Sequence, residues 1–299
     1  MLNVNPEESF KSAFVAVIGR PNVGKSTLVN RFLDQDLAVV SPKPQTTRNR
    51  ISAIMNYPNA QIVFYDTPGF HESTSALNQS LVSAAKKAAI DADLILFVTM
   101  AQSAISDDDH QLFEFLRGCK KPVVVAINKI DLLTKSQKKS VTRSYENLKF
   151  VKHLEPISAL TGEGMERLIE KIIVLAPEGT QFYAEDYISD LPERFFVAEF
   201  IREQIIHLTS QEIPYKSAVI IEKYVENPDR IIIHADIHVE RESQKKILIG
   251  HHGSMIRNIG IGARKKIEEF LNCPVHLELY IKVTPKWTSS PSKIRDFGY

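Results

Sequence analysis

The segment Gly19–Ser26 constrains this chain more than any other feature of its sequence. It reads GRPNVGKS and matches the pattern G-x-x-x-x-G-K-[ST], between a β-branched apolar run and the amphipathic stretch Lys25–Leu33. A glycine-rich loop between a strand and a helix wraps a phosphate, because loop amides and the helix N-terminus supply partial positive charge. We expect Lys25 to reach the β- and γ-phosphates of a nucleotide and Ser26 to offer its hydroxyl to Mg²⁺. Alone, the segment also fits a plain glycine-rich turn before a helix.

Four further elements follow in the order that a guanine-nucleotide site requires. Asp66–Gly69 (DTPG) ends a predicted strand, where the carboxylate is expected to hold Mg²⁺ through water and the glycine amide to approach a γ-phosphate. Asn128–Asp131 (NKID) ends another strand, and its last carboxylate can accept two hydrogen bonds from guanine, a pair that adenine lacks. Ser158–Leu160 (SAL) offers a backbone amide to the guanine O6, and a hydroxyl of Thr46 or Thr47 is expected to complete the Mg²⁺ shell.

Strand-like and helix-like segments alternate from Phe14 to about Pro177, which predicts a mostly parallel sheet covered by helices. In such sheets ligands bind at the carboxyl ends of the strands, where all of these motifs fall. The expected strands are Phe14–Gly19, Ile51–Met55, Gln61–Asp66, Leu94–Thr99, Val123–Asn128 and His153–Ser158. The expected helices are Lys25–Leu33, Leu77–Ile90, Asp107–Arg117, Gln137–Leu148 and Met165–Leu175.

A second, smaller α+β domain is expected after a linker rich in proline and acidic residues. The predicted order is α-β-β-α-α-β, with elements at Glu193–Thr209, Lys216–Val225, Arg230–Val239, Arg241–Ile249, Ser254–Leu271 and Pro274–Val283. The predicted boundaries are an N-terminal extension 1–12, a GTPase-type domain 13–177, a linker 178–192, the second domain 193–284 and an irregular tail 285–299.

Gly250–Gly253 (GHHG) lies between two predicted helices of this second domain. A G-x-x-G loop clamps a nucleic-acid backbone in KH domains, although alone it also fits a simple turn. Between Arg241 and Lys266 stand seven basic residues and one acidic residue, a local charge of +6 in a chain whose formal net charge is +1. The sequence therefore predicts a local phosphate-binding surface here. Ile256, which begins an apolar row of core-like spacing, is a candidate to line a base-binding groove.

These motifs together resemble the bacterial Era family of GTPases, over nearly the whole chain. The resemblance implies an α/β P-loop GTPase domain followed by a KH-type domain, hydrolysis of GTP to GDP and phosphate, and switch loops at Thr46-Thr47 and 66–74. It also implies binding to small-subunit ribosomal RNA near its 3′ end and a role in assembly of that subunit. The residues alone support a basic surface suited to single-stranded nucleic acid.

The motifs and the resemblance predict the following site residues. Predicted nucleotide-binding residues are Gly19, Arg20, Pro21, Asn22, Val23, Gly24, Lys25, Ser26, Thr27, Asp66, Thr67, Pro68, Gly69, Phe70, Asn128, Lys129, Ile130, Asp131, Ser158 and Ala159. Predicted catalytic residues are Lys25, Thr47 and Gly69, and predicted Mg²⁺ ligands are Ser26, Thr47 and Asp66. Predicted RNA-binding residues are Lys245, Lys246, Gly250, His251, His252, Gly253, Arg257, Arg264 and Lys265.

Phe70 bears on the rate of hydrolysis, because Ras-type enzymes orient the attacking water with a glutamine at the matching position. Phenylalanine has no polar group for this task, so we expect slow intrinsic turnover, with water placed by backbone groups, a cation or a partner. Asn22 matches a position that helps to hold K⁺ in related GTPases. Stimulation by K⁺ and ordinary loop hydrogen bonding are equally compatible with this residue.

Other metal sites are not favoured by the sequence. Asp107–His110 (DDDH) begins a predicted helix, and acidic residues in a first turn are expected from the helix macrodipole. His251 and His252 are adjacent, so we expect their side chains to point apart, and no third ligand is near. The two cysteines, Cys119 and Cys273, have no partner spacing, which argues against a zinc site or a disulfide framework and fits a reducing compartment.

The longest apolar runs are far shorter than the ~20 residues of a membrane-spanning helix. We expect a monomeric cytoplasmic protein, with peripheral contact at the inner face of the cell membrane left open by the resemblance. Three functions compete: a GTPase switch for small-subunit maturation, a GTPase for tRNA modification or membrane targeting, and an RNA-binding module whose GTP site is regulatory. A tRNA-modifying relative would need a further cofactor domain, for which no length remains.

Overall fold

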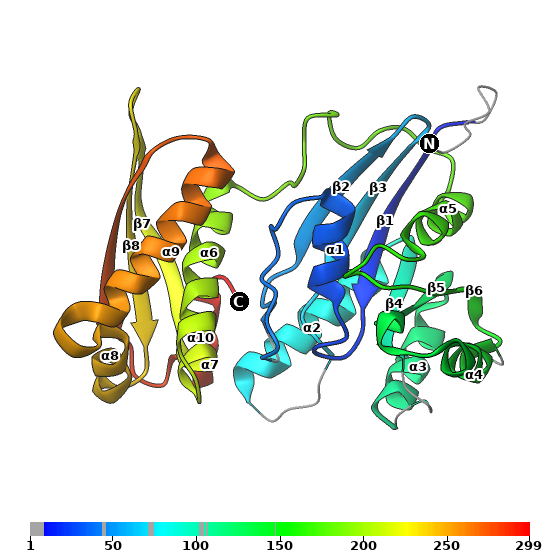
Figure 1. Cartoon of the computed structure of the whole chain (residues 1–299), viewed down its shortest axis with the longest axis horizontal. Coiled ribbons are helices and arrows are strands. Elements are labelled where there is room, and N and C mark those ends of the chain that lie inside the picture. The colour runs from blue at the N-terminus through cyan, green and yellow to red at the C-terminus, as the bar shows by residue number, and fades with distance from the viewer. Residues whose placement is uncertain (1–8, 44–45, 71–74, 102–104, 106, 147) are drawn as a thin grey trace. The chain divides into compact units, whose positions relative to one another are not determined.

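The chain forms two compact units in this computed structural model, which describes residues 9–43, 46–70, 75–101, 105, 107–146 and 148–299. The first unit comprises Met1–Ala38, Thr47–Ser73 and Leu81–Asp190, and the second comprises Val39–Thr46, Thr74–Ser80 and Leu191–Tyr299. Figure 1 labels most of the helices and strands of both units. Within the described residues, no helix is both long enough and apolar enough to cross a membrane.

A six-stranded sheet forms the centre of the first unit, in the order β2-β3-β1-β4-β5-β6. β2 runs antiparallel to β3, and the other neighbours are parallel. The strand order reverses at β1, so the loop that follows β1 lies at the switch point where open α/β sheets bind ligands. The strands are β1 (Lys11–Ile18), β2 (Ile51–Tyr57), β3 (Ala60–Asp66), β4 (Leu94–Met100), β5 (Val123–Asn128) and β6 (Val151–Pro156).

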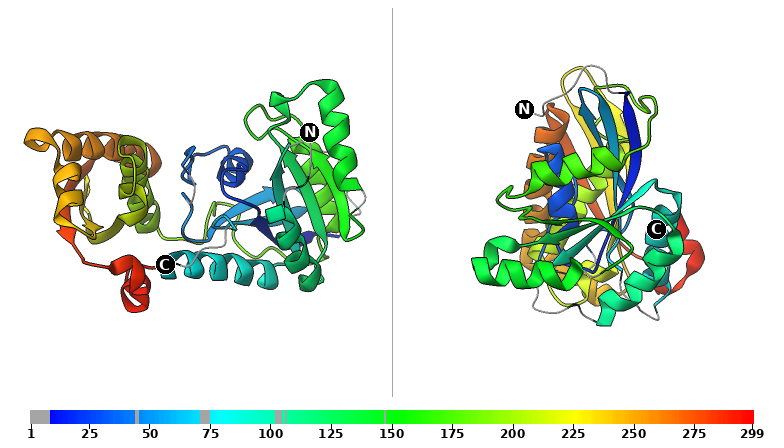
Figure 2. Two further views of the ribbon diagram at one scale, coloured as in Figure 1. Left: turned by 90° about the horizontal axis from the view of Figure 1, so that it is seen from below. Right: turned by 90° about the vertical axis from the view of Figure 1, so that its right-hand side faces the viewer.

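Helices cover both faces of this sheet, as Figure 2 shows. They are α1 (Lys25–Leu33), α2 (Ala76–Asp91), α3 (Asp107–Cys119), α4 (Lys135–Glu146) and α5 (Met165–Leu175). Alternate residues of a strand point to opposite faces. Thus Leu96 of β4 joins the core under α1 and α5, whereas Phe97 joins the core under α2, α3 and α4. Burial on both faces explains why these strands read as continuous apolar runs.

The second unit packs helices on a three-stranded sheet with the order β7-β8-β9. β7 pairs antiparallel with β8, and β8 pairs parallel with β9. Phe196 and Phe200 of α6 contact Phe270 of α9, and Gly262 of α9 lets Gln204 of α6 approach closely. The elements are α6 (Glu193–Leu208), α7 (Ile213–Lys216), β7 (Ala218–Glu226), β8 (Ile231–Val239), α8 (Glu242–Ile249), α9 (Ser254–Leu271) and β9 (Val275–Val283).

The predicted α/β domain followed by an α-β-β-α-α-β domain is confirmed, with small shifts at the ends of elements. The expectation of an irregular tail was wrong, because a 3₁₀ turn at Trp287–Ser289 and helix α10 (Pro291–Asp296) form there. Trp287 is fully buried, donates its indole N–H to the Lys216 carbonyl at 3.0 Å, and packs against Phe297. One buried aromatic residue therefore anchors a segment whose local sequence predicts little.

Candidate nucleotide site and nucleic-acid interface

The loop between β1 and α1 is shaped by two glycines with different tasks. A Cβ at Gly19 would lie 2.2 Å from the Val98 carbonyl oxygen of β4, so this position has no room for a side chain. Gly24 has φ +97°, a left-handed conformation that glycine adopts without strain, and it directly precedes α1. The first amides of α1 therefore point into a concave loop at the carboxyl end of the sheet, which is an arrangement for binding an anion.

Lys25 is only 6% exposed and turns back into this loop. Its ammonium group donates to the carbonyl oxygens of Gly19 at 3.1 Å and Arg20 at 2.9 Å. Burial lowers the pKa of Lys25 to about 8, while the nearby carboxylate of Asp66 opposes this shift. Burial destabilises the charged form of Lys25. An anionic ligand would stabilise that form, because phosphate oxygens replace the water that burial removed.

Three oxygen-bearing side chains meet beside Lys25. The Ser26 hydroxyl lies 2.8 Å from Asp66 Oδ2 and 2.9 Å from the Thr47 hydroxyl, and Thr47 lies 3.2 Å from the same carboxylate oxygen. Asp66 is fully buried, and burial raises the pKa of its carboxyl group against the opposing effects of Lys25, Ser26 and Thr47. Its other oxygen, Oδ1, has no well-aligned hydrogen bond within the described residues. Hard oxygen ligands of this kind fit Mg²⁺.

Asn128 links the glycine-rich loop to the loop that follows β6 through two side-chain hydrogen bonds. Its amide group donates to the Val23 carbonyl at 2.8 Å, and its side-chain oxygen accepts from the Ala159 amide at 2.9 Å. Lys129, in a left-handed conformation, donates to the Asn22 carbonyl at 2.7 Å. One buried side chain thus joins the segments 19–26, 128–131 and 158–160. The sequence motifs identified these segments separately, and the structure brings them together.

Asp131 and the loop 158–160 are the groups predicted to contact a guanine base. Asp131 lies exposed in a 3₁₀ turn directly after β5. A backbone amide of Ser158–Leu160 was predicted to meet the guanine O6, and that of Ala159 is already hydrogen-bonded to Asn128. The next amide, that of Leu160, has no hydrogen bond within the part of the chain described, and the Leu160 side chain is 73% exposed. Leu160 lies in the predicted segment Ser158–Leu160, although only Ser158 and Ala159 were named as site residues.

The segment Asp66–Gly69 packs against the glycine-rich loop Gly19–Ser26. Thr67 donates its hydroxyl to the Val17 carbonyl at 2.7 Å, and the Phe70 amide donates to the Gly19 carbonyl at 3.1 Å. A Cβ at Gly69 would lie 2.8 to 2.9 Å from Pro21, so only glycine allows this approach. The Phe70 ring stacks on Phe115 of α3 and is therefore turned toward the apolar core. Residues 71–74 of the predicted second switch loop lie outside the described residues.

The remaining predicted nucleotide residues line these loops. Pro68 and Ile130 are buried, Thr27 lies in the first turn of α1, and Ser158 is buried and accepts a hydrogen bond from the Thr161 amide. Arg20 belongs to the predicted nucleotide-binding loop, and its side chain pairs with Asp109 of α3 at 3.0 Å. That pairing uses an acidic residue that the sequence assigned only to the helix dipole.

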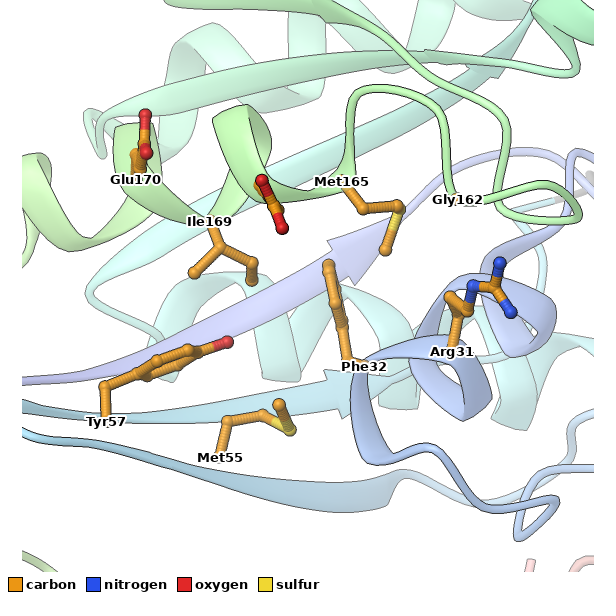
Figure 3. A pocket seen from close by; sticks show the side chains of 9 residues that line it. Arg31, Phe32, Met55, Tyr57, Gly162, Met165, Ile169 and Glu170 are labelled. Atoms are coloured by element: carbon orange, nitrogen blue, oxygen red, sulfur yellow. The ribbon is translucent and has the colours of Figure 1, made fainter. Parts of the chain in front are cut away.

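A separate cavity of about 450 Å³ lies between α1, β2 and α5 (Figure 3). Phe32, Met55, Met165 and Ile169 give it apolar walls, and Arg31 lies beside Gly162 at one end. The hydroxyl of Tyr57 points into it, and burial raises the pKa of this hydroxyl to about 12. No residue of the predicted nucleotide set lines this cavity.

The G-x-x-G loop of the second unit has a positive φ at three of its four residues. Gly250 and Gly253 have φ of +71° and +76°, and His252 between them has φ 50°. A Cβ at Gly250 would lie 2.7 Å from Met255, whereas a Cβ at Gly253 would meet nothing within 4 Å. The two histidine rings lie with centroids 4.1 Å apart, so the expectation that they point apart was wrong. The left-handed backbone of His252 explains the difference, because it turns the His252 side chain toward that of His251.

A groove of about 330 Å³ lies between α9 and β9. Ile256, Gly260 and Ile261 of α9 form one wall, and Leu277 and Leu279 of β9 form the other. Arg257 and Arg264, both predicted RNA-binding residues, line its edge. An apolar floor with two guanidinium groups suits the stacking of bases and the binding of their phosphates.

The basic residues of this region divide into two groups. Lys245, Lys246 and Lys265 extend from α8 and α9, and Lys265 is 80% exposed despite a 3.8 Å contact with Glu269. Lys266, counted in the local charge, instead pairs with Glu203 of α6 at 2.6 Å and lies over the Phe200 ring. The exposed lysines and arginines therefore carry the charge of this surface, and Lys266 stabilises the packing of α6 on α9.

Comparison with known proteins assigns both units. The family profile described as 50S ribosome-binding GTPase matches residues 14–129, and the KH domain profile matches residues 212–288. The protein named GTPase Era from Geotalea uraniireducens is 45% identical over 98% of this chain and 99% of its own length. GTPase Era from Syntrophus aciditrophicus is also 45% identical, over 97% and 95%. The chain belongs to the Era family of GTPases.

Solved structures of Era share the whole architecture. A crystal structure of Era in complex with MgGDPNP and nucleotides 1506–1542 of 16S ribosomal RNA has TM-score 0.93 and 39% identity, covering 97% of this chain and 99% of that chain. A single-residue variant of Aquifex aeolicus Era bound to GDP·AlF₄⁻ gives the same values. This Era-family chain is therefore a GTPase that joins an α/β GTPase domain to a KH domain, as the motifs predicted.

Proposed function

We propose that this Era-family GTPase binds Mg-GTP at the site described above, hydrolyses it slowly, and binds small-subunit ribosomal RNA near its 3′ end to assist assembly of that subunit. The proposal is supported by the convergence of Lys25, Ser26, Thr47 and Asp66 in one unit and by a G-x-x-G loop and an arginine-lined groove in the other. The solved Era complex with MgGDPNP and a 16S ribosomal RNA fragment supports the choice of both ligands.

The chain's own groups have distinct tasks in this mechanism. The amides of 19–26 and the Lys25 ammonium bind the β- and γ-phosphates, and the exposed carboxylate of Asp131 accepts from guanine while the Leu160 amide donates to O6. Ser26, Thr47 and Asp66 would hold Mg²⁺, since their oxygens already converge within 3.2 Å of one another and Asp66 Oδ1 has no well-aligned partner within the described residues. Bound there, Mg²⁺ would neutralise charge on the phosphates.

Phe70 stands at the position where Ras-type enzymes orient the attacking water with a glutamine, which supports slow turnover. Phe70 is stacked on Phe115 and carries no polar group, so it does not orient an attacking water. The water would instead be oriented by backbone groups near Gly69, by a cation such as K⁺ held with the help of Asn22, or by a partner. Replacing K⁺ by Na⁺ in a turnover assay tests the cation: a rate that falls supports the role of Asn22, and an unchanged rate removes it.

The RNA surface is proposed to work through backbone clamping and base stacking. The loop Gly250–Gly253 approaches the phosphates, Lys245, Lys246 and Lys265 add attraction, and Arg257 and Arg264 border the groove that receives bases. The histidines of the loop offer ring faces and hydrogen bonds to the same strand. Because most of these contacts are to phosphates, we expect affinity to fall steeply with salt.

Binding of a labelled 3′-terminal fragment of small-subunit ribosomal RNA tests the proposal, with the chain loaded with a non-hydrolysable GTP analogue. Gly253→Asp places a carboxylate where phosphates approach, in a position with open space, so affinity is expected to fall by a factor of about ten or more. Gly298→Asp is the matched control, because Gly298 also has a positive φ, +80°, and nothing within 4 Å. Equal binding by both variants would remove the clamp from the proposal.

A second candidate is favoured by the family profile that matches the first unit, whose description names the 50S ribosome. That profile covers only residues 14–129, whereas the solved Era complex with 16S RNA aligns with 97% of the chain. Cosedimentation with separated ribosomal subunits distinguishes the two. Binding to the small subunit in the GTP state is expected, and binding to the large subunit alone would favour the second candidate.

We also propose the domain boundaries 13–177 and 193–284, a monomeric state and a cytoplasmic location, with peripheral contact at the inner membrane face left open. Separate expression of the two segments tests the boundaries. Cell fractionation tests the location, and recovery mainly with membranes would contradict a cytoplasmic role.

A further inference from the structure

The side chain of Arg20 leaves the nucleotide loop instead of entering it. Its Nε lies 3.0 Å from Oδ1 of Asp109, and the two side chains are 18% and 2% exposed. The N–H of Nε is not aligned for a hydrogen bond. The contact is therefore an attraction between two net charges that have largely been removed from water, where such attraction is strongest.

The backbone of Arg20 is tied to the phosphate machinery at the same time. Its carbonyl oxygen accepts from the Lys25 ammonium at 2.9 Å, and the carbonyl of the preceding Gly19 accepts from both Lys25 and the Phe70 amide. One residue thus has its side chain fixed to α3 and its main chain fixed to the lysine that meets the phosphates. A displacement of Arg20 would therefore also displace the Lys25 ammonium group that is hydrogen-bonded to its carbonyl.

Asp109 is itself held firmly. It lies in the first turn of α3, where the helix macrodipole favours a negative charge. The next turn of the same helix packs Leu112 and Phe113 into the core of the first unit, against Phe97 of β4. Tyr145 of α4 lies close enough for Asp109 and Arg20 to act in opposite directions on the pKa of its hydroxyl, which burial raises. The carboxylate is therefore a fixed point for Arg20.

We propose that Asp109 is a positioning residue for nucleotide binding: through Arg20 it fixes the first turn of the loop 19–26 and hence the place of the Lys25 ammonium. Removing its charge leaves a largely buried guanidinium without its counter-ion, which is costly, and Arg20 then moves toward water. Because Lys25 is hydrogen-bonded to the Arg20 carbonyl, the lysine loses its geometry for the β- and γ-phosphates.

A double-mutant cycle with Asp109→Asn and Arg20→Gln, which removes the guanidinium charge, tests this, using the dissociation constants of GDP and a non-hydrolysable GTP analogue. Each single variant is expected to weaken binding about tenfold, and the double variant no more than either single, because both changes break the same link. Glu114→Gln is the matched control: it removes a carboxylate of α3 that pairs with Arg117 at 73% exposure, and it should leave affinity within about twofold.

Thermal unfolding of each variant without nucleotide separates positioning from general stability. An Asp109→Asn protein that stays folded, binds GDP and the GTP analogue about tenfold more weakly and needs about tenfold more GTP for half-maximal turnover supports the proposal. Unchanged affinity in Asp109→Asn, or single effects that multiply in the double variant, would overturn it. The inference depends on nucleotide binding at this loop, and loss of nucleotide binding by the wild-type chain would instead overturn the proposed function.

Discussion

Lys25 gives the sharpest prediction, because its protonation should change when nucleotide binds. Burial lowers its pKa from the ordinary 10.5 to about 8 in the nucleotide-free protein. Phosphate oxygens beside the ammonium favour the charged form and should return the pKa to its ordinary range. At a pH between about 8 and 10.5, Lys25 is deprotonated in the free protein and protonated in the nucleotide complex. Binding must therefore take up a proton in this window of pH.

The magnitude follows from the two pKa values. With a free pKa near 8, uptake should be about 0.1 proton at pH 7, about 0.5 at pH 8 and about 0.9 at pH 9. The sign is fixed by linkage: affinity falls as pH rises through the lower pKa, and the dissociation constant should be about tenfold larger at pH 9 than at pH 7. A lysine with an unshifted pKa would give almost no change over this range.

Calorimetric titration in buffers with different ionisation enthalpies measures the uptake directly. Lys25→Arg is the control, because arginine stays protonated throughout and reports the protons exchanged by the nucleotide and other groups. The difference between the two proteins isolates Lys25. A difference near zero at pH 8, with both proteins binding, would show that Lys25 is protonated in the free protein and would refute the reasoning.

Further substitutions test other parts of the structure. Asn128→Ala removes two buried hydrogen bonds, so the dissociation constant of GDP, measured by fluorescence, should rise by about tenfold or more. Gly69→Ala should weaken a GTP analogue more than GDP in the same assay, because the Pro21 contact forces the loop to move from the γ-phosphate. Gly164→Ala, with φ +81° and a Cβ 2.4 Å from the Pro156 carbonyl, should lower the free energy of unfolding by about 2 kcal/mol or more in urea. Gly118→Ala in α3, with open space around it, should raise the free energy of unfolding by about 0.5 kcal/mol.

Much of the fold could be predicted from short-range patterns. The strand Val123–Asn128 and the helices Lys25–Leu33, Met165–Leu175 and Ser254–Leu271 have the predicted ends, because apolar runs and helical spacing are local signals. Helix α10 was missed because its place depends on Trp287, whose burial against Lys216 and Phe297 is a long-range contact. Local pattern carries no information on such contacts.

The site could be predicted as a set of motifs, but the contacts between them could not. The sequence places Asn128 after a strand, and nothing in it indicates that this one side chain joins Val23 to Ala159. Arg20 was assigned through the loop motif and Lys266 through its charge, yet each side chain is paired with a buried acidic residue, Asp109 and Glu203 respectively. A charge in a sequence does not disclose its partner, because that partner lies on another element.

The central claim is that one chain joins a GTP site to a surface for the 3′ end of small-subunit ribosomal RNA. Crosslinking the protein to cellular RNA with a non-hydrolysable GTP analogue bound, followed by sequencing, tests it most directly. We predict reads concentrated at the 3′ end of small-subunit ribosomal RNA, which are lost with Gly253→Asp and retained with Gly298→Asp. Reads scattered over many RNAs, or equally abundant for both variants, would contradict the claim.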